Sequence, residues 1–142
     1  MDTKFSVAVH ILILISEAPN PLTSDQIAGS VGTNASYIRK ILSLLKKSGM
    51  IDSHRGVSGY VLTTTPDQIT LLRIYQAVMD DSKIHLWDIH QNPNDQCVVG
   101  RHIRPVLTGM FEGIEDAFAR ELSQKTLADC IEAIRTKMNQ TV

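Results

Sequence analysis

The sequence predicts a mainly α-helical fold with one small β-hairpin. Apolar residues recur at spacings of three and four through most of the chain, which is typical of helices with one buried face. The stretch from Met50 to Leu62 instead holds two short apolar segments around a glycine-rich tip, as expected for a hairpin. The chain has 142 residues, is 43% hydrophobic and 20% charged, and is long enough for one domain or one small domain with an oligomerisation arm.

The first predicted helix runs from about Thr3 to Ala18 and ends at Pro19-Asn20-Pro21. Its apolar residues are nearly continuous, so it should be buried on most sides. A signal peptide is the alternative for this segment, but the acid at Asp2 and the helical pattern count against it. The apolar stretch is also too short to span a bilayer. We therefore expect no membrane partner and a cytoplasmic protein.

A short second helix should follow, to Val31, because Thr23 and Gln26 form a capping-box pair. A third helix restarts at Asn34, a good N-cap. Its buried stripe is spaced i, i+3, i+4 and i+7. The stripe comprises Ile38, Ile41, Leu42 and Leu45, and the opposite face carries Ser36, Lys40, Ser43 and Lys47.

The third helix should end at Ser48-Gly49, ahead of strands at 50–53 and 60–62. Helix, short helix, turn, amphipathic helix and hairpin is the element order of a winged helix-turn-helix domain. We assign this domain to residues 1–80, including a helix from Leu71 to about Met79 that Thr70 caps.

Residues 81–104 are the least regular and should form a loop of sensor type, and residues 105–142 should form a long C-terminal dimerisation helix and a final helix. We expect the long helix to start at Pro105, since proline is tolerated in a first turn. Its apolar side is predicted as Leu107, Phe111, Ile114, Phe118 and Leu122. The last helix should start at Thr126, with Leu127, Cys130, Ile131, Ile134 and Met138 on one side.

Charge is distributed unevenly, although the formal net charge is only −1. From Thr33 to Arg55 there are five basic residues and one acid, whereas acids outnumber bases from Pro105 onward. This pattern favours a reader of nucleic acid with a separate assembly region. An amphipathic helix with lysines on its outer face is also common as a plain solvated face, so the charge counts only together with the element order.

The third helix and the hairpin tip are the predicted contacts with double-stranded DNA. The first turn of such a helix enters the major groove, where Arg39 could form a bidentate contact with guanine. Lys46 and Lys47 should meet phosphates, and Arg55 at the hairpin tip could enter a minor groove. The predicted DNA-binding residues are Ser24, Thr33, Asn34, Ser36, Tyr37, Arg39, Lys40, Lys47, Arg55, Ser58 and Tyr60.

Several stretches resemble the Rrf-two family of bacterial regulators. They are Ser24-Asp25-Gln26-Ile27-Ala28, Asn34-Ala35-Ser36-Tyr37-Ile38, Leu44 to Ile51, Arg55-Gly56-Val57-Ser58-Gly59-Tyr60-Val61-Leu62, Ile69-Thr70-Leu71 and Ala77-Val78. The resemblance implies a homodimer held by a long C-terminal helix. It also implies binding to a roughly palindromic operator, most often as a repressor.

The chain departs from the family pattern at two places. The hairpin has Ser58-Gly59-Tyr60 where the family usually has Gly-Gly-Tyr. Cluster-binding members carry three cysteines ahead of the dimerisation helix, but this chain has only Cys97 there. An iron–sulfur cluster needs a set of thiolates, so we expect no cofactor. The stretch from Pro93 to Gly100 resembles a cluster-free branch that keeps this single cysteine.

Cys97 is a candidate redox sensor, because nearby Arg101, His102 and Arg104 would lower its thiol pKa. The alternative is a cysteine with only a structural role. Cys130 is expected to be a small buried hydrophobe. The scattered His85, His90, His102 and Asp88 match no zinc spacing, so no metal is expected. No catalytic motif is present, and we do not expect an enzyme.

Three small residues, Gly109, Gly113 and Ala117, are spaced i, i+4 and i+8 in the long helix. They predict a close helix–helix contact, and a kinked or frayed helix is the alternative. The predicted dimer interface is Leu107, Gly109, Phe111, Gly113, Ile114, Ala117 and Phe118. Two other functions remain open: a winged-helix module that binds a protein and has lost DNA binding, and a thiol-redox protein. The sequence identifies neither the operator nor the effector, which could be a small molecule or an oxidant.

Overall fold

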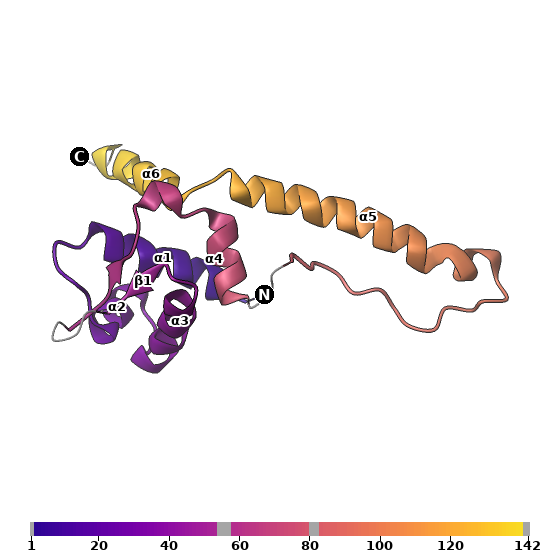
Figure 1. The fold of residues 1–142 in the computed structure, drawn as a ribbon, viewed down its shortest axis with the longest axis horizontal. Helices are drawn as coiled ribbons and strands as arrows, with labels where there is room; N and C mark the ends of the chain where they lie inside the picture. The colour runs from indigo at the N-terminus through magenta and orange to yellow at the C-terminus, as the bar shows by residue number, and fades with distance from the viewer. Residues whose placement is uncertain (1, 54–57, 80–82, 141–142) are drawn as a thin grey trace.

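The computed structural model describes residues 2–53, 58–79 and 83–140. These residues form a compact head from which a long arm projects (Figure 1). The predicted residue Arg55 lies outside the described residues.

The described part of the head contains four α-helices, one short 3-10 helix and a short hairpin. In chain order these are α1 (Lys4–Glu17), α2 (Ser24–Val31), α3 (Ala35–Lys47), β1 (Ile51–Asp52), β2 (Val61–Leu62), the 3-10 helix η1 (Pro66–Gln68) and α4 (Leu71–Val78). The two strands are antiparallel, with Ile51 opposite Leu62 and Asp52 opposite Val61. The order confirms the predicted winged helix-turn-helix architecture, with strands of two residues each.

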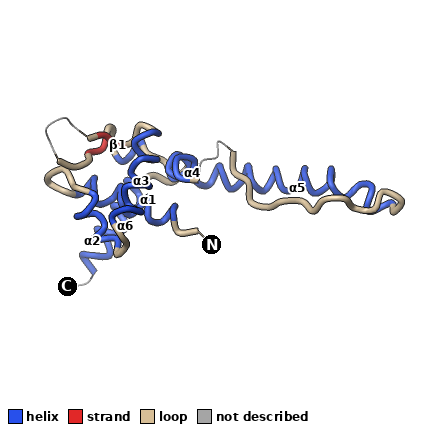
Figure 2. The backbone as a smooth tube through the Cα atoms, turned by 90° about the horizontal axis from the view of Figure 1, so that it is seen from below, coloured by secondary structure: helices blue, strands red, loops and turns tan. Residues whose placement is uncertain are grey.

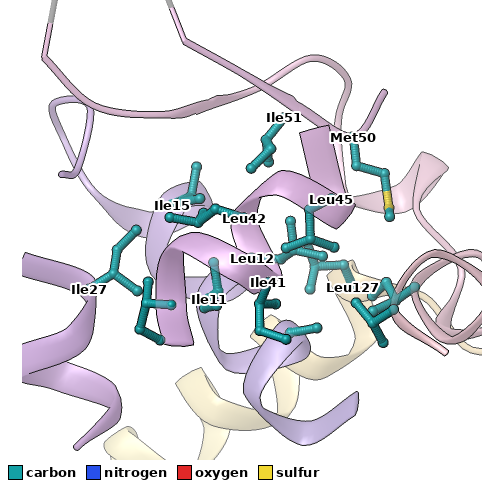
Figure 3. Packing of buried hydrophobic residues seen from close by; sticks show 14 of the residues in the cluster. Ile11, Leu12, Ile15, Ile27, Ile41, Leu42, Leu45, Met50, Ile51 and Leu127 are labelled. Carbon is teal, nitrogen blue, oxygen red and sulfur yellow. The ribbon is translucent and has the colours of Figure 1, made fainter. Parts of the chain in front are cut away.

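The core of the head lies between α1 and α3 (Figure 3). Every residue of the predicted α3 stripe, from Ile38 to Leu45, is completely buried. Ile11 and Leu12 of α1 meet this stripe and are equally inaccessible. Burial of large aliphatic side chains is the main force that holds such a head together, at roughly 1.5–3 kcal/mol per side chain. It fixes which side of α3 can face a ligand.

Local capping interactions fix both ends of α2 and the start of α3. The Thr23 hydroxyl accepts a hydrogen bond from the Gln26 amide, and the Gln26 side chain accepts one from the Thr23 amide. Gly32 ends α2 with a φ of 82°, a left-handed conformation that favours glycine. The Asn34 side chain then caps α3 through the Tyr37 amide at 2.8 Å. These caps agree with the predicted helix boundaries.

The arm consists of α5 (Val98–Ser123) and the segment of residues 83–97 that precedes it. At 26 residues, α5 is roughly 39 Å long. Residues 83–97 have no regular helix or strand and run beside α5 in both views (Figures 1 and 2). Within the part of the chain that is described, no helix combines the length and apolar character needed to cross a membrane.

The last helix, α6 (Leu127–Gln140), returns to the head and fixes the base of the arm. The Leu71 amide donates to the Lys125 carbonyl at 2.8 Å, and the Leu127 amide donates to the Ile69 carbonyl at the same distance. Leu127 and Ile131 enter the core, whereas Ile134 and Met138 of the same predicted stripe are exposed. The base of the arm is therefore hydrogen-bonded directly to the start of α4.

The predicted start of the long helix was wrong. The helix begins at Val98, seven residues before Pro105, and Pro105 lies inside it. A proline within a helix leaves the carbonyl four residues earlier without its donor. That carbonyl belongs to Arg101, and both Arg101 and Pro105 are exposed, so water can solvate it. The interior proline is tolerated for this reason.

Candidate nucleic-acid interface

The outer face of α3 is exposed and positively charged. Ser36, Arg39, Lys40, Ser43 and Lys47 are all exposed, opposite the completely buried stripe. The helix contains four cations and no carboxylate. A helix fixed on one side by a dry core and lined on the other by donors has the geometry that major-groove recognition requires.

The N-terminus of α3 offers donors to a phosphate. Of its first amides, that of Tyr37 is used by the Asn34 side chain, and that of Ile38 donates to the Asn34 carbonyl. The described contacts leave the amides of Ala35 and Ser36 for an anion, which the helix dipole also favours. Asn34 is exposed and Thr33 is half-buried at this end.

The two lysines at the C-terminal end of α3 differ in their surroundings. The Lys46 ammonium donates to the Ser53 hydroxyl at 3.0 Å and lies 3.9 Å from an Asp52 oxygen. Lys46 therefore ties α3 to the first strand of the hairpin. Lys47 is exposed on the outer face. Lys47 is thus the better phosphate contact of the two.

The base of the hairpin is held close to the chain that precedes α2. The Tyr60 amide donates to the Leu22 carbonyl at 2.8 Å. Gly59, the residue before Tyr60, has a φ of 119°. A Cβ at Gly59 would lie 2.8 Å from backbone atoms of Pro21 and Leu22. Ser58 is exposed, whereas Tyr60 is half-buried against the core. The hairpin leaves the head beside α2, whose first residue, Ser24, is half-buried.

The residues predicted for a dimer interface divide between two sides of α5. Phe111 packs on Trp87 of the same chain, with ring centroids 5.1 Å apart, and Phe118 meets Tyr75 at 6.4 Å. Leu107 is half-buried. By contrast, Gly109, Gly113, Ile114 and Ala117 are exposed. A Cβ added at either glycine would meet nothing within 4 Å.

A second row of apolar and small residues runs along α5, and the sequence analysis recognised only its last two members, Gly113 and Ala117. We call it the α5 seam, and it comprises Val99, Ile103, Val106, Met110, Gly113 and Ala117. Val99 and Met110 are 68% and 62% exposed, which is unusual for side chains of this kind. The spacing alternates between four and three, as in a coiled coil. This spacing was the available signal, and the prediction that the helix starts at Pro105 concealed its first half.

Cys97 is exposed at the N-cap of α5. The backbone amides of Gly100 and then Val99 lower the pKa of its thiol. The basic residues that the sequence analysis invoked are therefore not the cause. Cys130 lies in α6, where burial is the main cause of a raised thiol pKa and the neighbouring Asp129 adds to it.

The donor set does not fit an iron–sulfur cluster within one chain. Cys97 lies at the far end of the arm, and Cys130 lies in the helix that packs on the head. Among the described residues, no three His, Cys, Asp or Glu side chains are grouped so that they could hold a metal ion. Cluster ligation uses several thiolates from one region.

Known proteins resemble this chain over most of its length. The Rrf2 family model, described as "Iron-dependent Transcriptional regulator", matches residues 1–133. The "Putative HTH-type transcriptional regulator YwnA" of Bacillus subtilis (strain 168) is 40% identical over 91% of this chain and 95% of its own. A crystal structure of "a putative DNA binding protein" has 38% identity and a TM-score of 0.74 over 90% of this chain and 98% of that one. A "putative transcriptional regulator" from Lactobacillus plantarum has 27% identity and a TM-score of 0.75 over 99% and 93%.

Proposed function

The chain belongs to the Rrf2 family of transcriptional regulators, and we propose that it acts as a cytoplasmic homodimeric repressor on a palindromic operator. The family consists of regulators and not of enzymes. The observation that carries the proposal is the outer face of α3, which has three cations, no carboxylate and a buried opposite side. Arg39 supplies the base contact, and Lys47 with the first amides of α3 supplies phosphate contacts.

The α5 seam supports the homodimer. Its residues Val99, Val106 and Met110 are exposed, and Ile103 is half-buried. Among the described residues, no atom lies within 4 Å of a Cβ added at Gly113, whereas a second helix that approached closely would require glycine there. Because hydrogen bonds tie the base of the arm to α4, a dimer through α5 holds the two heads at a set separation. Such dimers read half-sites about 34 Å apart, one turn of DNA.

The test is fluorescence anisotropy with labelled DNA from upstream of the gene. Arg39→Ala should weaken binding by about 1–3 kcal/mol, or roughly 5- to 150-fold. Arg101→Ala, which removes an exposed cation from the arm, is the matched control and should leave affinity unchanged. Lys47→Ala should reduce the slope of affinity against salt by about one counterion. Absence of salt-sensitive binding would support a protein-binding module instead.

We also propose that the regulator works without an iron–sulfur cluster and responds to peroxide through Cys97. The lowered thiol pKa and the exposure of Cys97 support this. The Cys97 thiolate attacks one oxygen of hydrogen peroxide, so that a sulfur–oxygen bond forms and the oxygen–oxygen bond breaks. Hydroxide is the leaving group, and Cys97 becomes a sulfenic acid. Peroxide should release DNA from wild type but not from Cys97→Ser. Release from both would leave Cys97 a structural role.

A further inference from the structure

The arm contains a hollow that neither DNA reading nor the α5 seam uses. It has a volume of about 520 Å³ and lies between the segment of residues 85–91 and α5. Its walls include Trp87 and Phe111, and its charged side chains are Asp88, Arg104, Glu112 and Glu115. Ligand sites in proteins combine apolar and aromatic walls with a few polar groups in this manner.

Glu115 organises one wall of the hollow. It is 6% exposed, and it is the only buried charged side chain among the described residues. Its Oε2 accepts a hydrogen bond from the Leu86 amide at 2.5 Å and lies 3.9 Å from His85 Nδ1. Its carboxylate lines the hollow and contributes a negative group to that wall.

The aromatic wall joins the two sides of the hollow. Trp87, from the segment before α5, packs on Phe111 of α5 at a tilt of 53°. Trp87 remains 46% exposed, so much of its ring is free to meet another molecule. The faces of such rings carry negative potential and attract cations, most strongly for tryptophan.

The charge of the walls favours a cation. Three carboxylates line the hollow beside one guanidinium, that of Arg104, and two histidines. Asp88 Oδ1 lies 2.8 Å from His85 Nε2, so Glu112 and Glu115 are the carboxylates that an occupant would meet. Arg104 Nη1 already donates to Gln91 Oε1 at 3.2 Å and lies 3.4 Å from the His90 carbonyl. From the aromatic wall, the buried Glu115 carboxylate and this charge, we propose that the hollow binds an organic cation with an apolar body. A protonated or quaternary amine of moderate size is the chemical class.

This hollow stays accessible in the proposed dimer. At 100° per residue, Thr108, Phe111 and Glu115 lie on the side of α5 opposite to Val106, Met110 and Gly113. A bound cation would hold the segment of residues 85–91 against α5, the helix that carries the α5 seam. On the premise of the proposed function, it is therefore an effector site that changes how the two heads are held.

The test uses the natural reporter in the site, since Trp87 is the only tryptophan of the chain. Tetraphenylphosphonium is the probe, and tetraphenylborate, with a similar shape and opposite charge, is its control. We expect a saturable change in Trp87 emission, matched by calorimetry, with the phosphonium. The borate should bind at least about tenfold more weakly, because opposite charges attract and like charges repel at a partly enclosed site. Equal binding of both ions, or no saturable binding, would overturn the proposal.

Matched variants locate the site. Glu112→Gln and Glu115→Gln each remove one charge from the hollow and should weaken phosphonium binding by about tenfold or more. Asp116→Asn removes an exposed carboxylate of the same helix outside the hollow and should change nothing. Glu112 is exposed, so its variant keeps the test valid even where Glu115→Gln fails to fold. An unchanged affinity in Glu112→Gln would refute the assignment.

DNA binding is measured in the same preparation, which separates the two proposals. Phosphonium binding together with a change in DNA affinity supports the effector site. DNA binding without phosphonium binding overturns the hollow and leaves the repressor proposal intact. Phosphonium binding without any DNA binding overturns the repressor proposal and leaves the cation site.

Discussion

Gly59 is the position where the hairpin should be most sensitive to a single methyl group. A Cβ at this residue would lie 2.8 Å from the Leu22 nitrogen, the Leu22 oxygen and the Pro21 carbonyl carbon. All three are backbone atoms, and the Tyr60 amide is bonded to the same Leu22 carbonyl at 2.8 Å. The clash in Gly59→Ala therefore cannot be relieved by rotating a side chain.

The expected cost of Gly59→Ala has two parts. The φ of 119° is strained for any residue with a Cβ, at about 1–3 kcal/mol. Moving the hairpin to relieve the contacts adds about 1–3 kcal/mol. Together they predict a loss of about 2–6 kcal/mol. In a chain of this size each kcal/mol lowers Tm by roughly 2–4 °C, so Tm should fall by at least about 4 °C.

The assay is thermal unfolding followed by circular dichroism, together with DNA anisotropy at fixed salt. Gly29→Ala is the matched control, because it makes the same chemical change within α2, where a Cβ meets nothing within 4 Å. Alanine favours a helix over glycine by about 1 kcal/mol. Gly29→Ala should therefore raise Tm slightly, so that one substitution type gives opposite signs at two positions.

The result that would refute this reasoning is a Gly59→Ala protein that melts within about 1 °C of wild type and binds DNA within about twofold. A loss of stability smaller than expected, together with a large loss of DNA affinity, would mean that the hairpin shifts away from Pro21 and Leu22 and so relieves the strain. That outcome still requires Gly59 to position the hairpin against Pro21 and Leu22.

Three further predictions concern the arm. Gly100→Ala places a Cβ 2.1 Å from the Asn94 carbonyl oxygen. The substitution should displace the chain around Asn94 and change the alkylation rate of Cys97. An unchanged rate would contradict this prediction. A lowered pKa leaves more thiolate at a given pH, so iodoacetamide should label Cys97 at lower pH than Cys130, whose pKa is raised; peptide mass spectrometry that finds the reverse order counts against it. Met110→Lys should weaken the proposed dimer at least about a hundredfold, since an unpaired buried charge costs about 3–5 kcal/mol. The dissociation constant of the dimer is measured by sedimentation. Thr108→Lys, on the opposite side of α5, is the control and should remain dimeric.

The head was predictable because its determinants are local. The Thr23–Gln26 pair and Asn34 fix helix starts within four residues, and each occurs as expected. The buried stripe of α3 follows from the helical period alone. The exposed cations on its other face follow from the same period. What the sequence could not supply was Lys46, whose contact with Ser53 depends on how the first strand leaves the helix.

The arm was less predictable because its contacts join residues far apart in sequence. The hydrogen bond from Leu86 to Glu115 and the packing of Trp87 on Phe111 connect segments that no period relates. A proline usually marks a helix start, and here the helix passes through Pro105 because the freed carbonyl faces water. Phe111 and Phe118, which the sequence analysis assigned to a dimer face, each contact a ring of their own chain. Phe118 is still 40% exposed, and its place in a dimer stays a prediction.

The two sides of α5 explain why the arm is both amphipathic and incompletely covered. One side binds the preceding segment through Phe111 and Glu115, which gives the helix a folded environment without a second chain. On the other side, Val99, Val106 and Met110 expose about half to two thirds of their surface. Exposed apolar rows of this kind are unusual on monomeric proteins and mark interaction sites. A helix that satisfied only its own chain would place polar residues there. The sequence places apolar and small residues there instead, which supports the proposed homodimer through the α5 seam.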